Sequence, residues 1–221
     1  MFEVKELQKI YHIGTESIEA LKGISFTANA GEFVAIIGHS GSGKSTLLSV
    51  MGGLSRPTQG IVLMDQENIW ATNDNRRAQI RNSKVGFIFQ FASLIPTLTS
   101  LGNVLLPRLF DSAGLQAADE EQAKELLQLV GLSDKIYAYP NELSGGQQRR
   151  VAIARALINN PKIILADEPT GDLDEETEAE VMKLLLEKTR TLNAALIMVT
   201  HNPNISQRAD RVLQMKKGLL Q

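Results

Sequence analysis

The chain contains no cysteine, and neither sign of charge is in excess. The absence of cysteine excludes disulfides, thiolate zinc sites, iron–sulfur clusters and cysteine nucleophiles. Its 221 residues include 23 basic and 25 acidic side chains, which give a net charge of −2. No basic surplus indicates a nucleic-acid partner, and no acidic tract indicates disorder. We therefore expect a globular protein that binds no nucleic acid.

The chain also has no convincing membrane-spanning segment. Residues 85–107 carry no formal charge, and the 23 residues would be long enough to cross a bilayer. However, Gln90, Asn103, several hydroxyl side chains, two prolines and two glycines interrupt this stretch. A membrane span needs predominantly apolar residues, so we expect the segment to lie outside the bilayer.

Short apolar runs alternate with segments of helical periodicity, which predicts an α/β fold with a largely parallel sheet. A strand at 61–64 is expected to pair antiparallel with the N-terminal segments. The segment 91–160 has no strong strand pattern and at least two helices, so it is interpreted as an inserted helical lobe. The other predicted strands are 32–37, 85–89, 162–166 and 194–199, and the predicted helices include 46–51, 118–130 and 175–190.

Residues 38–45 match the phosphate-binding pattern G-x-x-x-x-G-K-[ST], with a predicted strand before them and a helix after them. Glycines let the backbone N–H groups point at phosphate oxygens, and the helix N-terminus adds partial positive charge. Lys44 is expected to reach the outer phosphates, and the Ser45 hydroxyl to bind Mg²⁺. The alternative is an ordinary glycine-rich turn, which this context disfavours. The expected nucleotide contacts are Gly38, His39, Ser40, Gly41, Ser42, Gly43, Lys44, Ser45 and Thr46.

Two carboxylates, Asp167 and Glu168, follow the apolar strand at 162–166. The carboxyl ends of parallel strands face the ligand crevice of an α/β protein. Asp167 is therefore expected to hold Mg²⁺, directly or through water, and Glu168 to act as general base toward the attacking water. An isolated Asp-Glu pair would more often cap a turn, here before Pro169.

A second glycine motif, L-S-G-G-Q, occupies residues 143–147 ahead of another predicted helix. Ser144 and Gln147 have the spacing of a capping box. The Ser144 hydroxyl and the N–H groups of Gly145 and Gly146 also suit a phosphate at a helix N-terminus. Capping and phosphate binding use the same donors, so the residues alone leave both interpretations open.

The L-S-G-G-Q motif between the phosphate loop and the acidic strand end resembles the signature of ATP-binding-cassette (ABC) ATPases, and the resemblance extends over essentially the whole chain. It implies one P-loop NTPase domain of ABC type over residues 1–221. A RecA-like, mostly parallel core (1–90 and 161–221) would carry an antiparallel β subdomain and an inserted α-helical subdomain (91–160). It also implies ATP and Mg²⁺ as cofactors and hydrolysis of ATP to ADP and phosphate.

The resemblance further implies a homodimer of cassettes with ATP at the interface. Ser144, Gly145, Gly146 and Gln147 of one chain would then bind the γ-phosphate of ATP held by the other. In the family's D-loop, residues 171–174, Asp174 matches and is assigned to dimer coupling. Gly171 and Asp172 depart from the commoner Ser-Ala, which puts the details of that coupling in doubt.

By the same resemblance, Gln90 would sense Mg²⁺ and the attacking water, so that Ser45, Gln90 and Asp167 form the metal site. His201 would contact the γ-phosphate and orient Glu168. Tyr11 would stack on adenine, with Ile18 at its edge. Without the family context, each residue has a simpler interpretation. Gln90 would be an ordinary residue at the start of a loop, His201 a solvated histidine and Tyr11 a half-buried tyrosine.

A finer similarity, to the lipoprotein-releasing and macrolide-efflux group, rests on residues 86–91, the Leu-Ile-Pro at 94–96 and the Gly-Asp-Leu-Asp loop. It implies a subunit bound to a separate integral membrane permease at the cytoplasmic face of the plasma (inner) membrane. Phe91, Leu94, Ile95 and Leu98 are the expected contacts of the permease's coupling helix. The alternatives are an ATP-dependent dimerisation switch in a non-transport complex, such as a cell-division complex, and a nucleic-acid-remodelling ATPase, which the net charge disfavours.

Overall fold

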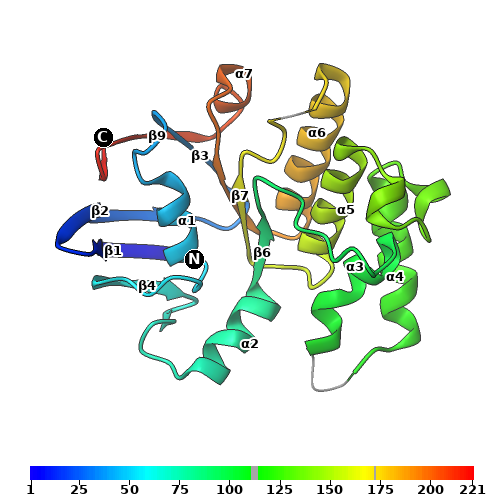
Figure 1. The fold of residues 1–221 in the computed structure, drawn as a ribbon, viewed down its shortest axis with the longest axis horizontal. Coiled ribbons are helices and arrows are strands. Elements are labelled where there is room, and N and C mark those ends of the chain that lie inside the picture. Colours follow the sequence, from blue (N-terminus) through cyan, green and yellow to red (C-terminus); the bar gives the residue numbers. More distant parts are fainter. Residues whose placement is uncertain (111–113, 172) are drawn as a thin grey trace.

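The computed structural model describes residues 1–110, 114–171 and 173–221. It contains a six-stranded sheet in the order β10-β9-β3-β8-β7-β6 and a four-stranded sheet in the order β2-β1-β4-β5. Figure 1 shows the helices α3 to α6 on one side of the larger sheet and the smaller sheet on the other. The described residues contain no helix with the length and apolar character needed to cross a bilayer.

The six-stranded sheet confirms the predicted, largely parallel α/β core. β3 (Phe33–Ile37) lies between β8 (Ala195–Val199) and β9 (Arg211–Lys216), and both pairings are parallel. β7 (Ile163–Asp167) continues the sheet from β8 to β6 (Val85–Ile88), again in parallel. Only β10 (Leu219–Leu220), at the edge, runs antiparallel. The sheet is therefore covered on both faces, as its apolar strands require.

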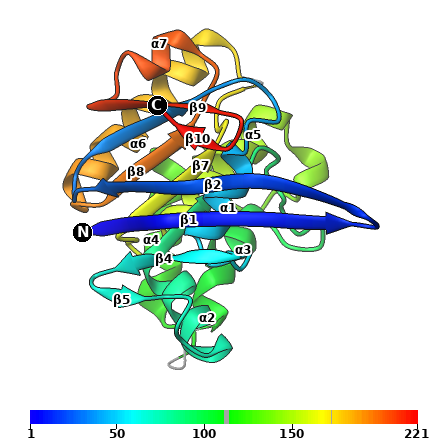
Figure 2. The ribbon, with the colours of Figure 1, turned by 90° about the vertical axis from the view of Figure 1, so that its left-hand side faces the viewer.

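The four-stranded sheet is antiparallel and contains the predicted pairing of 61–64 with the N-terminal segments. β1 (Phe2–Ile13) pairs with both β2 (Glu16–Ala28) and β4 (Gln59–Met64), while β5 (Glu67–Asn68) pairs with β4. Figure 2 shows β1 and β2 as one long ribbon. Their joined end extends beyond β4, so the tip of this ribbon is free to form part of a ligand site.

The helices agree with the predicted ones to within two residues at each end, where a prediction was made. α1 (Lys44–Met51), α4 (Ala117–Leu129) and α6 (Glu175–Thr191) correspond to those predicted from helical periodicity. α2, whose N-cap is Asn73, was not expected, because its residues are mostly polar and show little periodicity. The remaining helical segments are α2 (Asp74–Lys84), α3 (Ser100–Leu105), η1 (Leu106–Phe110), η2 (Ser133–Lys135), η3 (Pro140–Glu142), α5 (Gly145–Leu157) and α7 (Pro203–Ser206).

Two apolar cores lie on the opposite faces of the larger sheet. On β3, Phe33 and Ala35 enter the core shared with α3 to α6, whereas Val34 and Ile36 enter the core shared with α1 and the smaller sheet. This alternation follows from the two-residue period of a strand. Packing on both faces holds β3, β7 and β8 in place. It thereby also fixes the positions of the residues that follow the carboxyl ends of these strands.

Candidate active site

An open cavity of about 850 Å³ lies at the carboxyl ends of β3, β7 and β8. Within the described residues, it collects most of the predicted nucleotide-site side chains, although they come from distant parts of the sequence. Ser42 is the exception in the phosphate loop: it is buried behind the cavity wall. The predicted residues that line the cavity are Tyr11, Ile18, Gly38, His39, Ser40, Gly41, Gly43, Lys44, Ser45, Thr46, Gln90, Asp167, Glu168 and His201.

The loop between β3 and α1 requires glycine at two positions. A Cβ atom on Gly38 would lie 2.2 Å from the Met215 carbonyl oxygen, and one on Gly43 would lie 2.4 Å from that of Ala20. Gly43 also has a φ of +105°, a backbone conformation that favours glycine. The buried Lys44 ammonium donates to the carbonyl oxygens of Gly38 (2.8 Å) and His39 (2.9 Å). The loop is therefore curled around the positive charge of the Lys44 side chain. A curled loop with a positive charge at its centre suits the binding of phosphate.

A turn between β9 and β10 supports the same loop from behind, and the sequence did not indicate this. Gly218 N–H donates to the Ser42 carbonyl oxygen (3.0 Å), and Lys22 N–H donates to the Gly218 carbonyl oxygen (2.9 Å). Lys22, Lys217 and Gly218 consequently line the cavity as well. A Lys-Gly pair after an apolar run predicts a turn, but nothing local to it indicates that the turn reaches the phosphate loop.

Asp167 and Glu168 lie at the end of β7, as predicted. Burial raises the pKa of the Asp167 carboxyl above its ordinary value, against the opposing effects of a hydrogen bond with Ser45 and of the Lys44 charge. The Asp167 carboxylate and the Ser45 hydroxyl are thus neighbours, and both offer the oxygen ligands that Mg²⁺ prefers. The described residues contain no cluster of three or more His, Asp or Glu suited to a metal.

Glu168 adopts a backbone φ of +46°, in the left-handed region that non-glycine residues rarely occupy. Its N–H donates to the Val199 carbonyl oxygen (3.0 Å), which ties the end of β7 to the end of β8. The imidazole Nδ1 of His201 lies 3.1 Å from the Glu168 carboxylate Oε1. A carboxylate that contacts an imidazole at the mouth of an open cavity has the arrangement needed to accept a proton from water.

The loop that carries His201 is anchored from the neighbouring helix α6. Asn202 caps α7 by accepting from Asn204 N–H (2.9 Å), and its side-chain amide donates to both carboxylate oxygens of Glu178 (3.0 Å each). The His201 side chain itself remains 69% exposed. Its backbone is thus fixed while its ring faces the cavity.

Tyr11 and Ile18 lie side by side on neighbouring strands near the tip of the β1–β2 ribbon. They are register partners, and both are exposed beside the phosphate loop. The Lys9 ammonium lies 4.8 Å from the centre of the Tyr11 ring and donates to the Arg56 carbonyl oxygen (2.7 Å). This contact orients the aromatic ring. An exposed aromatic and an aliphatic side chain next to a phosphate site are suited to holding a planar base.

The signature residues do not line this cavity. Ser144 caps α5: its hydroxyl accepts from Gln147 N–H (3.2 Å), and its own N–H donates to Gln147 Oε1 (2.9 Å). The capping-box interpretation is therefore realised in the structure. Ser144 and Gly145 are nevertheless exposed, and a Cβ atom on Gly145 would meet open space. The start of α5 is thus accessible from outside the chain.

Asp174 is the N-cap of α6, with its carboxylate accepting from Thr177 N–H (2.9 Å) and from the Thr177 hydroxyl (2.8 Å). These hydrogen bonds hold the pKa of the Asp174 carboxyl below its ordinary value. Asp172, the other departure noted in this loop besides Gly171, lies outside the described residues.

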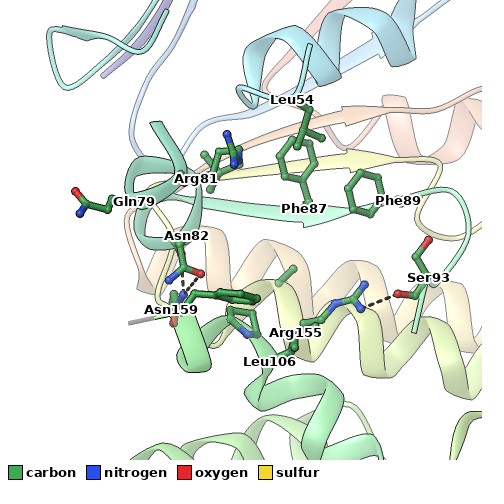
Figure 3. A pocket seen from close by; sticks show the side chains of 15 residues that line it. Leu54, Gln79, Arg81, Asn82, Phe87, Phe89, Ser93, Leu106, Arg155 and Asn159 are labelled. Atoms are coloured by element: carbon green, nitrogen blue, oxygen red, sulfur yellow. Dashed lines mark hydrogen bonds between the residues drawn. The ribbon is translucent and has the colours of Figure 1, made fainter. Parts of the chain in front are cut away.

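A second, mostly apolar cavity of about 650 Å³ opens between α2, β6, η1 and α5 (Figure 3). The rings of Phe87 and Phe89 are stacked in its wall with their centres 5.1 Å apart. Of the segment just after Gln90, where the sequence predicted a partner groove, Ser93 lines this cavity. The four predicted contacts Phe91, Leu94, Ile95 and Leu98 are not among its lining residues. Phe91 is 73% exposed, and Leu94 packs against the core shared with α3 to α6.

Comparisons with known proteins agree with this geometry. The family model described as ABC transporter matches residues 21–171. An uncharacterized ABC transporter ATP-binding protein of Thermotoga maritima is 48% identical over 222 residues, which cover 100% of this chain and 94% of that protein. The lipoprotein-releasing system ATP-binding protein LolD of Legionella pneumophila (strain Lens) is 46% identical over 217 residues, 98% of this chain and 95% of that protein.

Among solved structures, a dimeric post-hydrolysis state of the ATP-binding cassette MJ0796, bound to ADP and Pi, is similar over the whole chain. It matches with a TM-score of 0.94 at 42% identity and covers 100% of this chain and 97% of that chain. The expected fold, a P-loop ATPase of ABC type, is confirmed by this likeness. With the family model and the full-length relatives, it leads to one conclusion: this chain belongs to the ABC transporter family and is an ATPase subunit of it.

Proposed function

We propose that ATP binds in the 850 Å³ cavity with its phosphates in the loop at residues 38–46 and its adenine stacked on the Tyr11 ring, with Ile18 at the edge of the base. Glu168 accepts a proton from the water that attacks the γ-phosphate, and His201 orients that carboxylate. The observation that carries this proposal is the 3.1 Å contact between His201 Nδ1 and Glu168 Oε1 in the same cavity as the phosphate loop. The test is the ATPase rate of Glu168→Gln, which we expect to fall to background while ATP binding persists.

The oxygen ligands in the cavity support a Mg²⁺ site. Ser45 lies beside Asp167 and acts on the pKa of its carboxyl, and Gln90 lines the same cavity. When bound with ATP, Mg²⁺ would neutralise charge on the phosphates. The part of this chain is to present the Ser45 hydroxyl, the Asp167 carboxylate and the Gln90 amide, and to hold Lys44 against the phosphate loop.

The exposed start of α5 supports a shared site between two chains. Ser144, Gly145, Gly146 and Gln147 stand apart from the cavity, yet their donors are arranged as at an anion-binding helix N-terminus. The similar MJ0796 cassette was solved as a dimer. We infer that two copies of this chain pack head to tail, so that the signature of each contacts the γ-phosphate bound by the other. Asp174, which caps the start of α6, is assigned to the coupling between the two chains.

We further propose that the ATPase drives a separate membrane permease, which holds it at the cytoplasmic face of the inner membrane. Several relatives at 44–46% identity are named as ATP-binding proteins of a lipoprotein-releasing system, which favours that class over a division switch. The apolar cavity of Figure 3 suits a short apolar helix from such a permease. Phe89 lines this cavity, and the next residue, Gln90, lines the nucleotide cavity. A helix that docks here would therefore lie close to the nucleotide site.

The docking proposal is tested by charge substitution at Leu54, which lines the apolar cavity and is 50% exposed. Leu54→Glu should abolish co-purification with the permease while ATP binding by the isolated subunit stays unchanged. Phe91→Glu is the matched control, because Phe91 is exposed but lies outside that lining. Loss of co-purification with Phe91→Glu alone would instead support the groove expected from the sequence.

A further inference from the structure

The buried Arg149 lies in the second turn of α5, the helix that begins at the signature. Its side chain is only 5% exposed. A buried guanidinium needs hydrogen-bond acceptors in place of water, because its charge is otherwise costly to desolvate. The partners that it uses therefore show what this residue holds in place.

Two of the acceptors are main-chain carbonyl groups of residues predicted to act on ATP. Arg149 Nη1 donates to the Glu168 carbonyl oxygen at 3.0 Å, and Nη2 donates to the Gln90 carbonyl oxygen at 2.7 Å. Glu168 follows β7 and Gln90 follows β6, so a single planar guanidinium joins the ends of two neighbouring strands to α5. The fixed geometry of the guanidinium fork sets both carbonyl positions at once.

The bond to Glu168 acts on a peptide unit in an unfavourable conformation. Glu168 has a φ of +46°, and such conformations persist only where the surrounding structure imposes them. Its carbonyl oxygen accepts from Arg149 and also, at 3.3 Å, from Gly171 N–H. Without the guanidinium, the weaker Gly171 bond would be left to hold that carbonyl, and the carboxylate direction would change with the backbone.

We propose that Arg149 is a positioning residue, which fixes Glu168 and Gln90 in the geometry needed for hydrolysis and makes no contact with ATP itself. Arg149 is not one of the described residues that line the nucleotide cavity. The inference rests on the proposed role of Glu168 as base. Because Arg149 lies four residues after Gly145 on α5, it also joins the signature directly to the base of the same chain.

Two other arginines on α5 provide matched comparisons. Arg155 donates to the carbonyl oxygens of Ala92 (2.8 Å) and Ser93 (2.9 Å), so it binds the segment after Gln90 (Figure 3). Arg150 donates to the Val130 carbonyl oxygen (3.0 Å), which lies at the end of α4 and away from the cavity. Neither arginine donates one of these hydrogen bonds to Glu168. Arg150→Lys is therefore the control for a general loosening of α5.

The test compares Arg149→Lys, Arg149→Gln and Arg150→Lys with the wild-type chain. Lysine keeps the positive charge but offers a point donor in place of the fork, and glutamine keeps one donor without the charge. For each variant, kcat and KM of the ATPase, binding of a fluorescent ATP analogue and the thermal unfolding midpoint are measured. Glu168→Gln is assayed beside them. Circular dichroism identifies any variant that does not fold. If one Arg149 variant is unfolded, the kinetic comparison uses the other one.

We expect the Arg149 variants to lower kcat about 10²-fold, the scale of a small misplacement of a catalytic group. KM and the affinity for the ATP analogue should stay within about threefold of wild type, since no ATP contact is lost. Arg150→Lys should keep kcat within about twofold. A folded Arg149 variant with wild-type kcat, or an equal loss with Arg150→Lys, would overturn the inference. Continued turnover by Glu168→Gln would instead refute the proposed base.

Discussion

The imidazole Nδ1 of His201 and the carboxylate Oε1 of Glu168 lie 3.1 Å apart, although 33 positions separate these residues in the chain. The sheet register explains the contact. Asp167 and Val199 are register partners on the parallel strands β7 and β8, so Glu168 comes one residue and His201 two residues after neighbouring strand ends. The hydrogen bond from Glu168 N–H to the Val199 carbonyl oxygen then fixes their separation. The proposed base and the residue that orients it are thus set by strand pairing.

Replacing His201 tests this contact from the histidine side. In His201→Ala the Glu168 carboxylate loses its imidazole neighbour, and we expect kcat to fall about 10²-fold or more, the usual contribution of a positioned acid–base partner. ATP affinity, measured by isothermal titration, should change little because the phosphate loop is untouched. Asn202→Ala is a useful control, since it weakens the anchoring of the loop to Glu178 but keeps the imidazole. A wild-type kcat in His201→Ala would refute the assigned role.

Tyr11 provides a test of where the base of the nucleotide binds. Loss of one stacked aromatic ring costs about 1–3 kcal/mol of base binding, so Tyr11→Ala should raise KM for ATP by roughly 5- to 150-fold. The kcat at saturating ATP should stay near that of wild type, because the ring is remote from the γ-phosphate. Tyr11→Trp keeps an aromatic face and should restore most of the affinity. Equal KM values for all three proteins would show that adenine binds elsewhere.

Lys44 should be needed for binding itself. Its ammonium already donates to the Gly38 and His39 carbonyl oxygens, so it is in place before any phosphate arrives. Hydrogen bonds to charged groups contribute about 1.5–3 kcal/mol, which predicts a 10- to 150-fold weaker ATP affinity in Lys44→Ala. Calorimetric titration of the purified variant measures this. Unchanged affinity would contradict the location of the phosphates.

Asp167 should show a conflict between stability and activity. Because burial raises the pKa of its carboxyl, the folded chain favours the protonated form and the ionised form destabilises it. In nucleotide-free protein with a metal chelator at pH 7, Asp167→Asn should therefore unfold at a higher temperature than wild type. That advantage should shrink as the pH falls through the raised pKa and the wild-type carboxyl takes up its proton. ATPase activity with Mg²⁺ should be lost.

Much of the fold was predictable because its signals are local. The phosphate loop, the apolar strand that ends at Asp167 and the helix periodicity of residues 118–130 are each readable within about ten residues of sequence. The capping box of Ser144 and Gln147 was equally visible, and the structure contains it. By contrast, α2 was not predicted, because a mostly polar helix lacks the apolar stripe that indicates helical periodicity.

The parts of the site that could not be predicted depend on tertiary contacts. Lys217 and Gly218 reach the phosphate loop only because β9 pairs with β3. In sequence, Arg149 resembles any arginine of a helix, and its proposed role follows from two carbonyl groups of residues that come after β7 and β6. The apolar cavity similarly joins residues of α2, β6, η1 and α5, and no local pattern marks it.

We propose that two copies of this chain share each ATP, and the association state of Glu168→Gln provides a direct measurement of this. Sedimentation velocity with ATP and Mg²⁺ should show a dimer, which reverts to monomer when ATP is removed. Adding Ser144→Arg to the same chain should prevent the dimer while each monomer still binds ATP, because Ser144 lies outside its own cavity. A Glu168→Gln chain that stays monomeric with ATP bound, or a dimer unaffected by Ser144→Arg, would contradict the account.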